Sequence, residues 1–110
     1  MTSAPELPKA YQLFVERYPK LGQAWELSAE AGEEGPLDAK TVRLVKLAIA
    51  MGALREGAVH ANVRKAMAAG ISTEEIEQVV ALGAGTLGFP STVALFCWAQ
   101  DVIGKPSGQQ

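Results

Sequence analysis

The segment GALREGAVHANVRKAMAAG, residues 52–70, carries the side chains best suited to chemistry. It combines Arg55, Glu56 and the one histidine of the chain, His60, within an otherwise apolar, Ala-rich stretch. Carboxyl and imidazole groups can give and take protons near neutral pH, and a guanidinium group can bind a carboxylate. The segment therefore predicts Glu56 and His60 as catalytic residues and Arg55 as a substrate-binding residue.

A helix over residues 56–69 would bring the two predicted proton carriers together. Its apolar stripe, at 100° per residue, consists of Val59, Val63, Ala66 and Met67. Glu56 falls within this stripe and His60 lies at its border, four residues later, so their side chains can meet. An acidic residue in a first helical turn also stabilises the helix dipole. The pair could therefore be an acid–base pair or only a capping contact.

A second group of cations precedes this helix. Arg43 and Lys46 lie on a narrow polar side of the helix predicted over residues 38–54. Together with Arg55 they could hold an anionic substrate, and we assign Arg43 to substrate binding on this basis. The alternative is that these cations are solvated and form surface ion pairs.

Helical periodicity recurs along the chain, and no segment shows the strict alternation typical of strands. We expect about six helices, over residues 8–17, 21–31, 38–54, 56–69, 73–87 and 90–103. Asp38 is a good N-cap, and Gly70 is a typical C-terminal signal. Ser72 and Glu75 match a capping box. The predicted fold is all-α, with a single domain over residues 1–110 and flexible ends at 1–7 and 104–110.

Composition indicates a cytoplasmic globular protein. Hydrophobic residues make up 48% of the chain and charged residues 20%, as in ordinary soluble domains. The net charge is −2 and no basic cluster is visible, which argues against a nucleic-acid partner. The first residues lack the pattern of a signal peptide.

The single cysteine, Cys97, limits the redox and metal chemistry of the chain. It excludes an intrachain disulfide and a zinc site with several thiolates, and we expect no metal and no cofactor. Cys97 lies in the apolar run VALFCWAQ, so a buried structural thiol is the favoured interpretation. The alternative is single-thiol redox chemistry, which requires an exposed thiol of low pKa.

Residues 78–100 carry no charge and are numerous enough to span a bilayer. Gly88 and Pro90 interrupt this run, so we interpret it as two buried helices that meet at GFP, without a membrane span. The same region contains GAGTLG, residues 83–88, which matches the dinucleotide fingerprint. That fingerprint needs a preceding strand, whereas a helical pattern precedes it here. We therefore reject nucleotide binding.

Three patterns together resemble the carboxymuconolactone decarboxylase family, which includes the alkyl hydroperoxidase D-like proteins. They are LDAKTVRLVKLAIAMGAL (37–54), HANVRKAMAAGISTEEIEQVV (60–80) and LGFPSTVALF (87–96). The resemblance covers about the last two-thirds of the chain. It implies an all-α fold of about six helices that assembles into trimers or hexamers, with an active site in a pocket near subunit contacts.

The hydroperoxidase branch of this family uses a Cys-x-x-Cys pair, a histidine and an upstream glutamate. Carried over, the two cysteines fall on Arg55 and Ala58, the histidine on Asn62 and the glutamate on Arg43. A two-thiol peroxidase needs an attacking and a resolving thiol. The resemblance therefore does not extend to thiol peroxidase activity.

The decarboxylase branch tends to begin this helix with an Asn-Arg-Glu-like sequence, and LREGAV keeps Arg55 and Glu56 in that register. Asn62 again replaces the family histidine, and we assign it to substrate binding. His60 lies two residues earlier, about 160° around the helix. The resemblance implies a cofactor-free carboxy-lyase that acts on a small anionic, carboxylated or lactone substrate. The alternative is a non-catalytic homo-oligomeric module that binds a small molecule or a partner.

Overall fold

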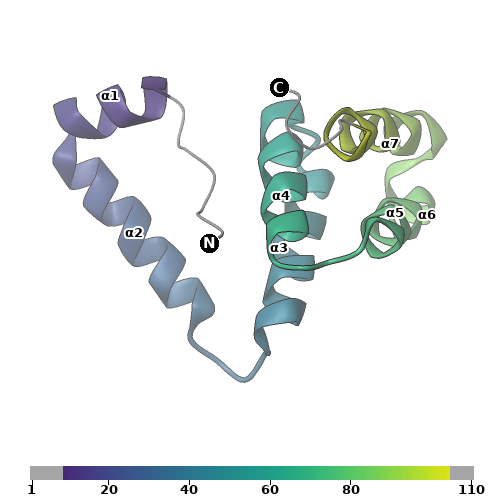
Figure 1. Ribbon diagram of the computed structural model, residues 1–110, viewed down its shortest axis with the longest axis horizontal. Coiled ribbons are helices and arrows are strands. Elements are labelled where there is room, and N and C mark those ends of the chain that lie inside the picture. The colour runs from purple at the N-terminus through teal and green to yellow at the C-terminus, as the bar shows by residue number, and fades with distance from the viewer. Residues whose placement is uncertain (1–8, 105–110) are drawn as a thin grey trace. The chain divides into compact units, whose positions relative to one another are not determined.

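The computed structural model describes residues 9–104, and every regular element within that range is a helix (Figure 1). The predicted all-α fold is thus confirmed. The helices are α1 (Lys9–Arg17), α2 (Pro19–Glu33), α3 (Ala39–Gly52), α4 (Glu56–Ala68), α5 (Thr73–Leu82), α6 (Ala84–Leu87) and α7 (Phe89–Ile103). The ends that we expect to be flexible lie outside the described residues, apart from Gly104, which caps α7.

The predicted caps are confirmed at two helix starts. The Asp38 carboxylate accepts a hydrogen bond from the Thr41 backbone amide at 2.7 Å, ahead of α3. Ser72 and Glu75 form the capping box of α5. The Ser72 hydroxyl accepts from the Glu75 amide at 3.1 Å, and the Glu75 carboxylate accepts from the Ser72 amide at 2.9 Å. These caps satisfy amides that the helices themselves leave unpaired.

The helix expected over residues 73–87 is divided in two. α5 ends at Leu82, Gly83 intervenes, and the single turn of α6 follows. Gly88, at φ 90° and ψ 160°, then reverses the chain before α7. A side chain at that φ would be strained, so glycine suits the position. The small residues of GAGTLG therefore build a helical corner between α5 and α7.

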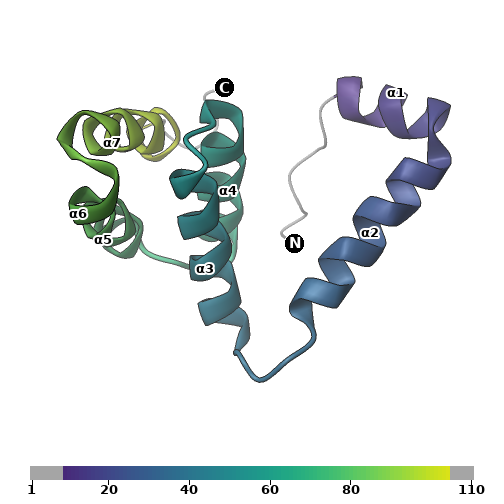
Figure 2. The ribbon, with the colours of Figure 1, turned by 180° about the vertical axis from the view of Figure 1, so that it is seen from behind.

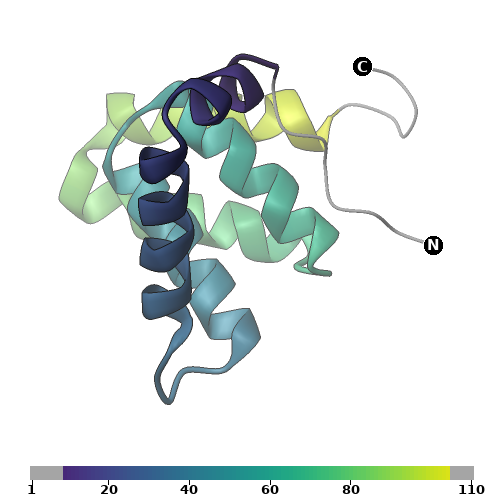
Figure 3. The same ribbon diagram turned by 90° about the vertical axis from the view of Figure 1, so that its left-hand side faces the viewer.

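The described residues divide into two compact units, with the boundary between Leu37 and Asp38. The first contains α1 and α2, which follow one another directly, in purple and blue in Figure 3. Neither helix has a buried residue. The exposed large apolar side chains of these helices are Leu13, Phe14, Leu21, Trp25 and Leu27, and Tyr18 between the two helices is exposed as well. These two helices thus present apolar side chains without a core of their own.

The second unit, α3 to α7, contains the hydrophobic core. α4 packs against both α3 and α7, and α5 packs against α3 and α7 (Figure 2). The fully buried side chains of the core include Leu47, Val59, Val63, Ile76 and Leu95. Because α4 lies between two neighbouring helices, its opposite edges meet different partners. This arrangement decides which polar side chains of α4 come together.

Candidate functional site

His60 lies between two carboxylates at one edge of α4. Its Nε2 atom is 2.9 Å from Oδ2 of Asp101, which is on α7. The same nitrogen is 3.8 Å from Oε2 of Glu56, one turn earlier on α4. One ring nitrogen of His60 and one carboxylate oxygen from each of Glu56 and Asp101 all lie within 4.8 Å of one another. Glu56 and His60 therefore do approach each other, as their spacing predicts, and Asp101 joins them.

The cluster is open to solvent on its carboxylate side. The His60 side chain is 24% exposed, whereas those of Glu56 and Asp101 are 58% and 51% exposed. A small substrate could therefore reach the carboxylates while the imidazole remains partly shielded. One imidazole and two carboxylates are also donor types that bind divalent cations. The arrangement can exchange protons, hold a cation, or simply link α4 to α7.

Asp101 was not predicted from the sequence. It lies 41 residues beyond His60, at the end of an apolar helix, and no spacing rule links the two. The tight packing of α4 on α7 brings them together. The one available signal was a lone carboxylate near the end of an apolar run. This signal did not indicate which residue the carboxylate would contact.

Arg55 and Asn62 lie close to this cluster in the chain but have different surroundings. Arg55 occupies the N-cap position of α4, with an exposed side chain, next to Glu56. Asn62 is half-buried and its Nδ2 donates to the Ala58 carbonyl at 2.9 Å. This bond occupies one donor of the Asn62 amide within its own helix.

Arg43, on α3, belongs to a cluster of basic residues that lies at another edge of α4. Partial burial lowers the pKa of Lys65, and the positive charges of Arg43, Lys46 and Arg64 lower it further. Lys65 lies five residues beyond His60, about 140° around the helix. The structure thus brings Arg43 toward Lys65, and brings Glu56 and Asp101 toward His60.

Cys97 is exposed, which corrects the expectation of a buried thiol. On α7 the buried side chains are Leu95 and Ala99, two residues before and after it. A step of two residues turns about 200° around a helix, so Cys97 points away from the core. The apolar run suggested burial because Phe96 and Val93 also lie in it, and both of these side chains are exposed as well.

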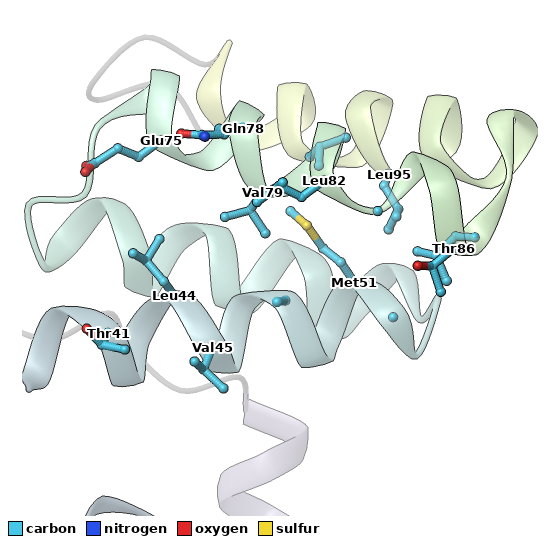
Figure 4. A pocket seen from close by; sticks show the side chains of 15 residues that line it. Thr41, Leu44, Val45, Met51, Glu75, Gln78, Val79, Leu82, Thr86 and Leu95 are labelled. Atoms are coloured by element: carbon cyan, nitrogen blue, oxygen red, sulfur yellow. The ribbon is translucent and has the colours of Figure 1, made fainter. Parts of the chain in front are cut away.

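A separate pocket of about 540 Å³ lies between α3 and α5, as Figure 4 shows. Its lining residues come from α3, from α5 and α6, and from Leu95 of α7. None of Glu56, His60 and Asp101 lines it. The described part of the second unit therefore presents a polar cluster and, elsewhere, an apolar pocket.

Comparison with known proteins identifies the family. The model of the carboxymuconolactone decarboxylase family matches residues 19–101, most of the chain. The protein therefore belongs to the carboxymuconolactone decarboxylase family, as its three sequence patterns indicated. A search of curated proteins found no match, and a search of solved structures found none either. Within residues 9–104, no helix is both long and apolar enough to cross a membrane.

Proposed function

We propose that this family member is a cofactor-free carboxy-lyase that acts on a small carboxylated or lactone substrate. The observation that supports it is the Glu56–His60–Asp101 cluster, in which two carboxylates approach a single imidazole nitrogen. The cluster begins in the first turn of α4, within the region matched by the family model. Groups of these types can move a proton at the surface of a bound ligand.

The reaction needs an anion-binding group and a proton donor. Arg55 binds the substrate carboxylate, assisted by the N-terminus of α4, where unpaired amides favour anions. Loss of CO2 breaks a carbon–carbon bond and leaves its electron pair on the substrate. His60 protonates that carbon, and Glu56 passes a proton from solvent water back to the imidazole, so the reaction takes up one proton from solvent. Asp101 orients the ring through its 2.9 Å contact.

The test is turnover of 4-carboxymuconolactone by the purified protein, followed by ultraviolet absorbance. We expect Glu56→Gln and His60→Gln to lower kcat by about 100-fold or more, in the range of general acid–base effects. Glu74→Gln, which also removes an exposed carboxylate near the start of a helix, is the matched control and should leave turnover unchanged. Equal activity in all three variants would reject these roles.

A second candidate is a non-catalytic binding module. It is favoured by the fact that Nε2 of His60, the atom that would carry the proton, already contacts Asp101 of a neighbouring helix. Such a contact can serve only to hold α4 and α7 together. Under this alternative no carboxylated lactone is turned over, and the variants of Glu56 and His60 change only stability, by at most about 1 kcal/mol.

We also propose that the chain assembles as a homo-oligomer, a trimer or a hexamer. The support is the absence of any buried residue in α1 and α2, together with their exposed apolar side chains. Contiguous exposed apolar surface commonly marks an interface between proteins.

A further inference from the structure

Side chains of the hydrophobic core form the floor of the pocket between α3 and α5. Met51, Val80 and Leu95 line it and are also nearly inaccessible side chains of the hydrophobic core. Val45 and Leu82 form its more exposed walls. Its volume of about 540 Å³ lies within the range of small-molecule pockets, which spans roughly 300 to 1,000 Å³. The apolar floor therefore favours contact with an apolar ligand over contact with water.

Polar groups occur mainly toward the two ends of this pocket. In Figure 4, Thr41, Glu75 and Gln78 lie toward one end and Thr86 lies at the other. The lining on α3 runs from Thr41 to Gly52, so the pocket extends for about 16 Å along the helix at 1.5 Å per residue. A ligand that fills it is therefore elongated.

The one charged lining residue already has its partners. Glu75 accepts the Ser72 amide in the capping box, and its other oxygen is 2.6 Å from Nζ of Lys40. A second charge placed beside this pair would lose hydration without gaining a free partner. The side chains of Gln78 and Thr86 have no hydrogen-bond partner among residues 9–104 and remain available to an uncharged polar group.

We propose that the pocket between α3 and α5 binds an uncharged, elongated, apolar small molecule that carries a hydroxyl or carbonyl group. Gln78 holds that polar group at one end, and Met51, Val79 and Leu95 contact the apolar body. This site goes beyond the proposed lyase activity and shares no residue with the Glu56–His60–Asp101 cluster. A failure of one proposal therefore leaves the other standing.

The experiment uses the full chain and the uncharged fluorophore N-phenyl-1-naphthylamine. Its fluorescence should rise on binding, and 1-decanol should displace it about tenfold more effectively than decanoate, a difference of about 1.4 kcal/mol. Ala48→Phe places a ring in the pocket from an exposed position of α3 and should weaken probe binding at least tenfold. Ala68→Phe, at an exposed position of α4 outside the lining, is the matched control and should bind normally.

Gln78→Leu separates the role of the polar end from that of the apolar body. We expect it to weaken 1-decanol and to leave the fluorophore unaffected. Equal binding by Ala48→Phe and the wild type would overturn the proposal, as would the absence of probe binding by the folded protein. Light scattering completes the set, because a smaller particle in Ala48→Phe would show that a second copy occupies the pocket.

Discussion

At His60 the local chain supplies one carboxylate and the tertiary fold supplies another. Glu56 is one helical turn away, at 3.8 Å, and it would be near in any structure that keeps α4. Asp101 is closer, at 2.9 Å, but only because α7 packs on α4. If the cluster acts as a proton relay, the residue from the distant helix positions the ring. Experiment can distinguish this orienting role of Asp101 from a purely structural contact.

We predict that Asp101→Asn lowers kcat on the confirmed substrate by about tenfold or more while KM changes little, because the ring loses its orienting charge. The same change should lower the free energy of unfolding by at most about 1 kcal/mol, since the Asp101 side chain is half exposed. Steady-state kinetics and urea denaturation, run on the same preparation, measure both effects. A loss of stability without any loss of kcat would make the contact structural.

Cys97 also allows a residue-scale prediction. Its exposed side chain should react with a thiol reagent in the native protein, at about one equivalent per chain. Titration before and after addition of denaturant measures the accessible fraction. Cys97→Ser, which removes the only thiol, is the blank. Reaction only after unfolding would mean that assembly covers this face of α7.

At the scale of single elements, the helix caps were the features that short sequence patterns predicted best. Asp38 and the Ser72–Glu75 box mark the starts of α3 and α5, and both caps are present in the structure. The corner between α5 and α7 was less predictable. The periodicity of residues 73–87 continues through Gly83, and only the packing of α5 and α6 on α7 shows where the axis changes.

The caps predict how stability responds to acid. Hydrogen bonds from the Thr41 side chain and backbone amide lower the pKa of Asp38. A hydrogen bond from Lys40, together with the Ser72 amide, lowers the pKa of Glu75. A lowered native pKa adds stability above the unfolded-state value, and this contribution is lost as the pH falls through the native value. We therefore expect Tm to fall on acidification below about pH 5.

The Asp38→Asn variant measures how much of this fall in Tm is due to the Asp38 cap. Asparagine caps helices about as well as aspartate but does not titrate. Thermal unfolding from neutral pH down to about pH 2.5 should therefore show a shallower decline of Tm in Asp38→Asn than in the wild type. Asp38→Ala, which removes the acceptor, should instead lower Tm at all pH values. A decline of equal slope in Asp38→Asn and the wild type would assign the acid response to other carboxylates.

At the scale of the whole molecule, the described residues of the first unit, 9–37, include no buried side chain. α1 and α2 have no buried residue, so their apolar side chains need another surface. On α2, Leu21 and Trp25 share one face, and Glu26 and Glu30 lie on the other. This amphipathic pattern fits a helix that packs along one side in an assembly.

We predict that light scattering will find a trimer or hexamer at micromolar concentration. Trp25→Ser should shift the distribution toward smaller particles, because it removes a large apolar side chain that is 62% exposed in the single chain. Glu30→Ser, on the opposite face of α2, should leave the mass unchanged. A stable monomer in the wild type would refute the oligomer proposal.

The sequence by itself determined the all-α class, the family and the positions of the main caps. These properties depend on local periodicity and on short-range hydrogen bonds, which neighbouring residues decide. It also predicted the approach of Glu56 to His60, because four residues separate neighbours on a helix face.

Only the tertiary structure decided which distant groups meet. Asp101 reaches His60, Arg43 approaches Lys65 from α3, and Cys97 turns away from the core, because α3, α4 and α7 each pack in one orientation. The same packing of α3 beside α5 created the apolar pocket. Such contacts depend on how helix faces fit together. No spacing along the chain records that fit.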